Sequence, residues 1–132
     1  MTTSLSPKLQ TAKRRLLAVL KRHGIALVEI DYDGEEDNGQ ILSINTYTAA
    51  SEPIRIDKPV RLQLGTDDLA RKPRPLHDVL DDFAWMLLRE FHEGFEDNDG
   101  AFGTIKIDVP ERRIYVDHNA RINDYHQTVS EV

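Results

Sequence analysis

The chain has 132 residues, a formal net charge of −6 and no cysteine. This length fits one domain with a single core, and the lack of cysteine excludes disulfides, thiolate metal sites and cysteine nucleophiles. No apolar run approaches the roughly 20 residues of a membrane helix and the N-terminus lacks a secretory signal, so we expect a soluble cytoplasmic protein that makes no membrane contact.

Charge is distributed unevenly along the chain. Residues 1–24 hold six bases and no acid, so the remainder carries −12. An acidic body argues against direct nucleic-acid binding, because like charge repels phosphate. The basic segment fits the solvated face of a helix, with a role at a membrane surface or a nucleic acid as the alternative.

Residues 6–24 predict an amphipathic helix. Ser6 followed by Pro7 is a typical helix start, because proline lacks an N–H that would have no partner in the first turn. Gly24 is placed to end the helix in a left-handed conformation. Apolar residues recur at helical spacing, at Leu5, Leu9, Ala12, Leu16, Val19 and Leu20.

Residues 25–47 predict a hairpin. Alternation favours a strand at 25–32, with Ala26, Val28, Ile30 and Tyr32 on one side and Glu29 and Asp31 on the other. Residues 33–39 predict a turn-forming loop, and residues 41–47 the returning strand. The tip is acidic, since six carboxylates and no base lie between Glu29 and Asp37.

Residues 49–75 are interrupted by Pro53, Pro59, Pro73 and Pro75. They predict one or two short strands at a sheet edge, where proline is tolerated. Residues 75–93 predict a second helix that carries much of the core. Its apolar face consists of Leu76, Val79, Leu80, Phe83, Ala84, Leu87, Leu88 and Phe91. Trp85 falls on its polar side.

A loop rich in carboxylates, glycines and aromatics follows at 91–103, and strands at 104–109 and 114–117 form a second hairpin. The order helix, hairpin, strand, helix, hairpin predicts an α+β fold, in which two helices pack on one face of an antiparallel sheet of four to five strands. We expect residues 1–132 to form a single domain with frayed ends at 1–5 and 124–132.

Three motifs follow one another along the chain: Tyr32-Asp-Gly…Asp37-Asn-Gly-Gln40, Gly94-Phe-Glu-Asp-Asn-Asp-Gly-Ala-Phe-Gly103 and Asp117-His-Asn-Ala-Arg121. On these motifs the chain resembles a family of small bacterial and mobile-element proteins known only as a domain of unknown function. Phe95 and Ala120 stand where that family has tryptophan and glutamate. The resemblance implies an α+β fold and a mobile-element context, and no reaction.

The acidic loops invite a test for metal sites. The sequence does not match the EF-hand calcium-binding loop, because Phe95 stands at its first ligand position and Lys106 stands where its last glutamate should be. A looser oxygen site from Asp97 and Asp99 with Asp33 or Asp37 stays open.

A small divalent-metal-dependent hydrolase is a second possibility, since carboxylates and imidazoles can hold a metal and activate water. Its ligands would come from His92, Glu96, Asp97, Asp99, Asp117 and His118. Asp117 and His118 could both ligate only if their strand has ended, because neighbouring residues of a strand face opposite sides.

Acids clustered around aromatics are typical of a protein-binding surface, where aromatics anchor the partner and charges steer the encounter. The residues predicted to bind a partner are Asp33, Glu35, Glu36, Asp37, Trp85, Phe95, Glu96, Asp97, Asp99 and Phe102. The leading hypothesis is therefore a non-enzymatic interaction protein of a mobile element that acts on a basic protein, for example as an inhibitor of a nucleic-acid-handling host system. No cofactor is expected, and the residues specify no oligomeric state. An acidic surface that only keeps the protein soluble is the simpler alternative.

Overall fold

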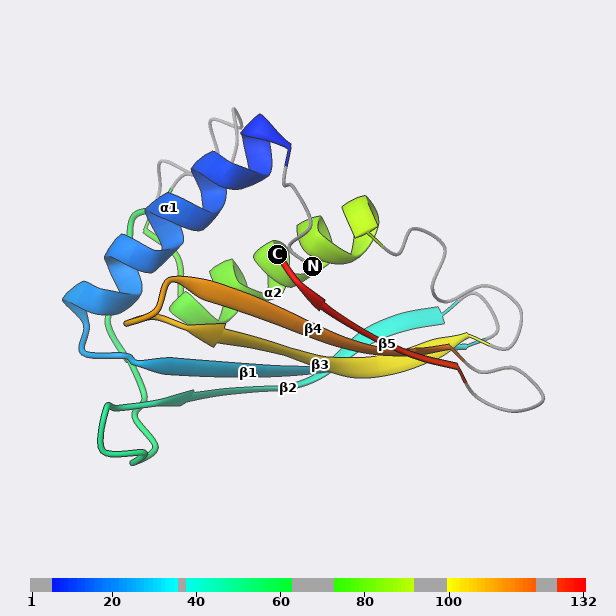
Figure 1. Cartoon of the computed structure of the whole chain (residues 1–132). Helices are drawn as coiled ribbons and strands as arrows, with labels where there is room; N and C mark the ends of the chain where they lie inside the picture. The colour runs from blue at the N-terminus through cyan, green and yellow to red at the C-terminus, as the bar shows by residue number, and fades with distance from the viewer. Residues whose placement is uncertain (1–5, 36–37, 63–72, 92–99, 121–125) are drawn as a thin grey trace.

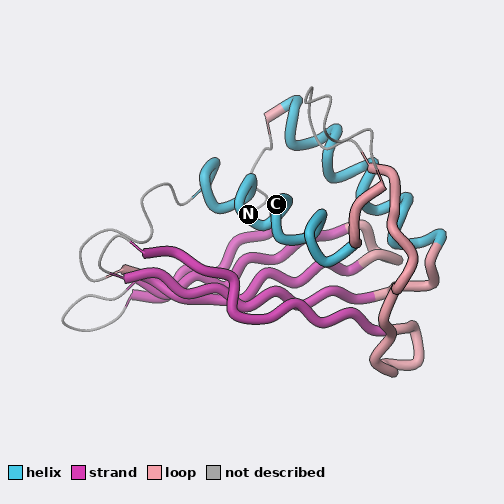
Figure 2. Tube along the Cα trace, turned by 180° about the vertical axis from the view of Figure 1, so that it is seen from behind, coloured by secondary structure: helices cyan, strands magenta, loops and turns pink. Residues whose placement is uncertain are grey.

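The computed structural model describes residues 6–35, 38–62, 73–91, 100–120 and 126–132. Two helices, α1 (Pro7–Arg22) and α2 (Leu76–Phe91), lie on one side of a five-stranded antiparallel sheet (Figures 1 and 2). The strands are β1 (Leu27–Glu35), β2 (Asn38–Tyr47), β3 (Ala101–Asp108), β4 (Arg113–Ala120) and β5 (His126–Glu131), in the spatial order β2-β1-β3-β4-β5. The predicted α+β class is confirmed. No helix in these ranges is long and apolar enough to span a membrane.

The start and end of α1 follow from local chemistry. The Ser6 hydroxyl accepts a hydrogen bond from the backbone N–H of Leu9 at 3.3 Å, and Pro7 opens the first turn. Gly24 has φ of +75°, a conformation that a residue with a Cβ adopts only with strain. The predicted boundaries of this helix are confirmed.

The core lies between the two helices and the sheet. Val28, Ile30 and Tyr32 of β1 are buried on the side toward the helices, together with Ile105 of β3 and Phe83 of α2. Because side chains alternate along a strand, the residues between them point to the opposite side of the sheet. We call this second side, which neither helix covers, the open face.

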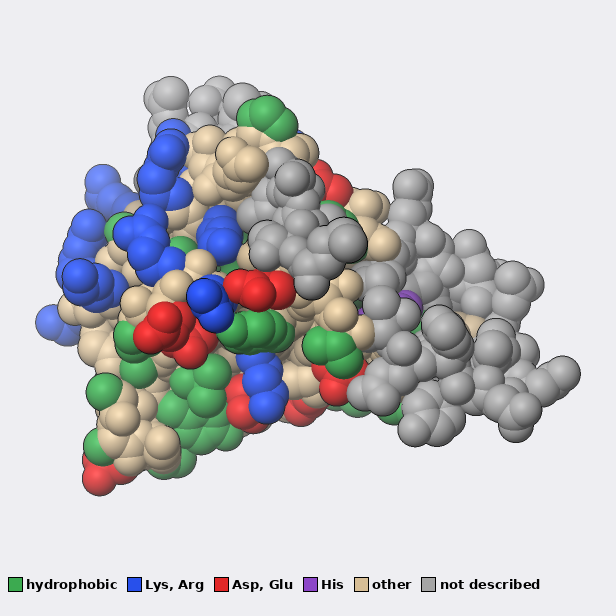
Figure 3. Space-filling view, viewed as in Figure 1, with side chains coloured by type: hydrophobic (Ala, Val, Ile, Leu, Met, Phe, Trp, Pro, Cys, Tyr) green, Lys and Arg blue, Asp and Glu red, His purple; other side chains and the backbone are tan. Residues whose placement is uncertain are grey.

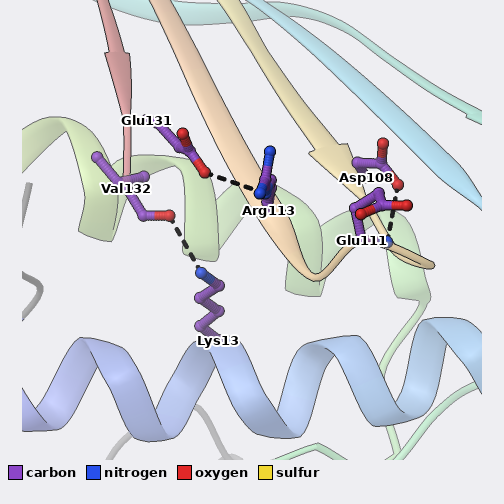
Figure 4. A network of polar contacts seen from close by, with 6 residues as sticks. All are labelled: Lys13, Asp108, Glu111, Arg113, Glu131 and Val132. Atoms are coloured by element: carbon purple, nitrogen blue, oxygen red, sulfur yellow. Dashed lines mark hydrogen bonds and ion pairs between the residues drawn. The ribbon is translucent and has the colours of Figure 1, made fainter. Parts of the chain in front are cut away.

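The residue that follows β5 contacts α1 (Figure 4). Lys13 Nζ of α1 donates a hydrogen bond to the backbone oxygen of Val132 at 3.1 Å, and burial lowers the pKa of Lys13. Arg113 and Glu131 form an ion pair at 3.3 Å nearby. Residues 124–132 were expected to fray; within them, residues 126–131 form β5, which pairs with β4, and Val132 is buried in the core.

Two further predictions about segments are corrected. The described parts of 49–75 form isolated bridges, Tyr47 with Pro53 and Val60 with Arg74, and no strand. The predicted loop at 33–39 is largely strand, because β1 continues to Glu35 and β2 begins at Asn38. Hydrogen bonding to β2 on one side and β3 on the other stabilises the end of β1, despite its polar sequence.

Candidate functional site

The open face has a shallow depression with a volume of about 440 Å³. It lies over β1, β3 and β4, where Asp31, Thr104 and Asp117 stand directly opposite one another. Asp33 is next along β1 and also lines it. Of the described residues that line the depression, three are carboxylates and none is a base. The depression therefore favours positively charged groups.

Asp31 is held in place by its two neighbouring strands. Ser43 of β2 donates its hydroxyl hydrogen to Asp31 Oδ2 at 2.8 Å, and Thr104 of β3 donates to Oδ1 at 2.6 Å. Both carboxylate oxygens thus have a donor, which fixes the orientation of the carboxylate. A pre-oriented carboxylate loses little conformational entropy when a cationic group binds to it.

Exposed apolar side chains accompany the carboxylates. Among the described residues, the large hydrophobic side chains that are exposed are Leu42 (57%), Phe102 (38%) and Val129 (64%). Leu42 and Phe102 line the depression. Val129 of β5 stands opposite Asp117, so it lies on the same face. The open face therefore combines a carboxylate-lined depression with exposed apolar side chains.

A buried polar cluster lies on the covered side of the same strands. Tyr32, Gly103 and His118 stand opposite one another on β1, β3 and β4, and Tyr32 Oη lies 2.6 Å from His118 Nδ1. Burial, together with the negative charge of Asp117, raises the pKa of Tyr32. The phenol therefore keeps its proton at neutral pH, and its hydrogen bond with His118 links β1 to β4 across Gly103.

The raised pKa of Tyr32 predicts a loss of stability at high pH. A group whose pKa is raised on folding gives its full stabilisation below the unfolded pKa, about 10 for tyrosine, and loses it as the pH rises toward the folded pKa. Above pH ~10 the free energy of unfolding of the parent should fall more steeply than that of Tyr32→Phe, by about 1.4 kcal/mol per pH unit. Denaturant unfolding from pH 8 to 11 measures both slopes. Parallel curves would contradict the assignment, because all other titrating groups are common to the two proteins.

The predicted site residues are distributed over different parts of the fold. Asp33 and Phe102 lie opposite each other on the open face, so these two can belong to one binding surface. Trp85 does not join them, because it is half-buried on α2 against the core, with the Arg89 guanidinium 5.8 Å from its ring centroid. The side chain of Glu35 and all of Glu36, Asp37, Phe95, Glu96, Asp97 and Asp99 lie outside the described residues.

The two described residues of the predicted metal-dependent hydrolase site lie on opposite sides of the sheet. Because β4 continues to Ala120, Asp117 faces the open face and His118 is buried on the covered side, so one ion could not bind both. His92, Glu96, Asp97 and Asp99 lie outside the described residues. The residues that are described contain no group of three or more side chains suited to a metal ion.

The residues that sequence reasoning missed are those of the open face. Asp31, Ser43, Thr104 and Asn119 were not predicted to take part in a site, although all line the depression. The signal available was the alternation of β1, which already placed Glu29 and Asp31 opposite the buried residues. The pairing of β1 with β3 was needed to bring Thr104 and Asp117 beside them.

Basic side chains are concentrated elsewhere. Lys and Arg side chains gather over α1 in Figure 3, and Arg14, Arg15, Lys21 and Arg22 are exposed there. The helix and the depression lie on opposite sides of the sheet, which separates the basic and the acidic surface.

Comparison with known families matches residues 9–131 to DUF6878, which is described as a family of unknown function. No curated protein and no solved structure matches the chain.

Proposed function

The chain belongs to DUF6878, a family of unknown function, and we propose that it is a non-enzymatic interaction protein whose open face binds a basic protein. One observation carries the proposal: the exposed large apolar side chains of the described residues share one face with a carboxylate-lined depression. Apolar anchors supply binding energy, and unlike charges accelerate the encounter.

The chemistry of the depression suits arginine better than lysine. Asp33 lies on β1, two residues from Asp31, and Asp117 lies on β4 opposite Thr104, so carboxylate oxygens are presented from two strands. A planar guanidinium can donate to several carboxylate oxygens and stack on an aromatic ring such as that of Phe102. The proposed partner therefore presents an arginine flanked by apolar side chains.

A mobile-element product that inhibits a nucleic-acid-handling host protein is the concrete form of this proposal. Proteins that bind nucleic acid expose arginine and lysine toward the phosphates. Carboxylates arrayed on a sheet can imitate the phosphates and occupy the basic groove of such a protein. The acidic composition of the chain outside residues 1–24 supports this version.

Reducing the negative charge of the depression should weaken binding without unfolding the protein. In Asp33→Asn/Asp117→Asn, two negative charges are lost, and the affinity for a fluorescent arginine-rich peptide should fall by about tenfold, or ~1.4 kcal/mol. Fluorescence anisotropy at two salt concentrations measures this, and the salt dependence should be smaller in the variant than in the parent. Asp31 is left intact because its carboxylate links three strands.

Asp78→Asn/Glu90→Gln is the matched control, since it removes the same charge from exposed positions on α2, across the sheet from the depression. Its affinity should stay within about twofold of the parent, ~0.4 kcal/mol. Equal losses in both double variants would show that net charge alone governs binding, and the open face would then not be the site.

A further inference from the structure

The edge strand β2 differs in composition from the rest of the chain. Charged residues make up 30% of the sequence, yet Asn38–Tyr47 contains no charge and no proline. Natural sheets normally protect an edge with lysine, proline or a covering segment, because its free N–H and C=O groups can pair with another strand. The other edge, β5, is shorter and carries Glu131 in an ion pair with Arg113.

The outer side of β2 is covered at one end only, as far as the chain is described. Ile54 N–H donates to the Thr46 carbonyl at 3.0 Å, and the Thr46 hydroxyl donates to the Ile54 carbonyl. This short segment shows that the edge accepts an extended partner. From 38 to 45, no described segment pairs with it on that side.

A bulge arranges the apolar residues of this edge. Asp31 pairs with Ser43, and Tyr32 pairs with Ile41, so Leu42 is an extra residue. Ile41 and Ile44 consequently both face the helices, where they are only partly buried against the core. Leu42 points to the open face and is 57% exposed. A strand added at this edge would cover apolar surface on both faces of the sheet.

We propose that the occupant of this edge is a second copy of the chain, paired antiparallel through β2 about a two-fold axis. In a symmetric pair, a charged strand would face the same charges on its copy and be repelled. The uncharged β2 avoids this repulsion, although the protein has a net charge of −6. With the axis beside Leu42 and Ser43, Ile41 faces Ile44 of the other copy, and polar Gln40 faces polar Asn45. The two sheets become one continuous sheet of ten strands.

The acidic open faces do not oppose this dimer. The open-face carboxylates Asp31 and Asp33 lie on β1, one strand from the edge. Three strand spacings, about 14 Å, then separate β1 from its counterpart, which exceeds the Debye length of about 8 Å at physiological salt. Since the contact itself is neutral, the dimer should persist at high salt. This proposal does not depend on the proposed function.

Light scattering coupled to gel filtration tests the dimer on the full chain. The parent should have a mass of about 30 kDa, twice the 15.1 kDa of the chain, with and without added salt. Leu42→Lys should shift it to monomer, because two like charges meet at the two-fold axis. The new lysine lies beside Asp31 and Asp33, so the monomer should remain folded. Should it fail to fold, Ser43→Lys makes the same test, because residue 43 also lies at the axis and beside Asp31.

Val129→Lys is the matched control. It makes the same apolar-to-lysine change at an exposed position on the same face, but at the far strand of the sheet. It should remain a dimer. The chain has no cysteine, so Leu42→Cys places its one thiol at the interface, and oxidation should link two copies there but not in Val129→Cys.

Three results would overturn the proposal. The parent could be a monomer at every concentration measured. The dimer could survive both edge lysines, which would place the interface elsewhere. Val129→Lys could dissociate the dimer as fully as Leu42→Lys, which would indicate contact through the open faces instead of the edges.

Discussion

Replacing Phe83 with alanine is expected to lower the free energy of unfolding by about 3–5 kcal/mol. Phe83 is fully buried in the core, at the centre of the apolar face of α2. The truncation removes apolar burial and leaves a cavity that close-packed neighbours fill only in part. Denaturant unfolding monitored by circular dichroism measures the loss.

Phe102→Ala provides the comparison, since it removes the same ring from a site that is 38% exposed. Its effect should be about 1 kcal/mol or less, because surface substitutions seldom cost more. A melting temperature of Phe83→Ala within a degree or two of the parent would contradict the packing of α2 on the sheet.

Gly103→Ala is expected to destabilise the protein by about 3 kcal/mol, at the upper end of overpacking effects. A Cβ at this position would lie 2.0 Å from the backbone oxygen of Asp117 and 2.6 Å from Tyr32 Oη. Neither neighbour can move freely, because Asp117 belongs to the β3–β4 ladder and Tyr32 is hydrogen-bonded to His118. The strand therefore requires glycine to let the Tyr32 ring reach across β3.

Gly24→Ala separates this steric effect from the general effect of replacing glycine. A Cβ at Gly24 meets nothing within 4 Å, and the substitution suffers only from the positive φ, which costs about 1–2 kcal/mol. Unfolding of the two variants side by side should rank Gly103→Ala as the more damaging. The opposite order would mean that β3 and β4 can separate locally at little expense.

Local chemistry in the sequence was enough to predict α1, α2 and most of β1 to β4. Ser6, Pro7 and Gly24 act within one helical turn, and the apolar periodicity of α2 reflects one buried face. These signals depend on neighbours a few residues away, so the sequence contains them directly. The resemblance to a family of unknown function was likewise correct.

Errors arose where long-range pairing overrides local preference. Residues 126–131 have little apolar character, but β4 offers an unpaired edge and α1 offers Lys13, so β5 forms. Asp33 and Gly34 favour turns, yet β2 and β3 pair with them from both sides. A segment with weak propensity becomes a strand when its backbone hydrogen bonds are supplied by partners distant in sequence.

The sequence by itself determined the fold class, the helix boundaries, which side chains of β1 are buried, and the excess of carboxylates over bases outside the first helix. The tertiary structure decided which of those carboxylates act together, because the strand order β2-β1-β3-β4-β5 brings Asp31 of β1 beside Thr104 and Asp117. It also placed Asp117 and His118 on opposite faces and left β2 at an edge. Side-chain spacing along the chain fixes a face, but only hydrogen bonding between distant strands fixes which faces and edges become neighbours.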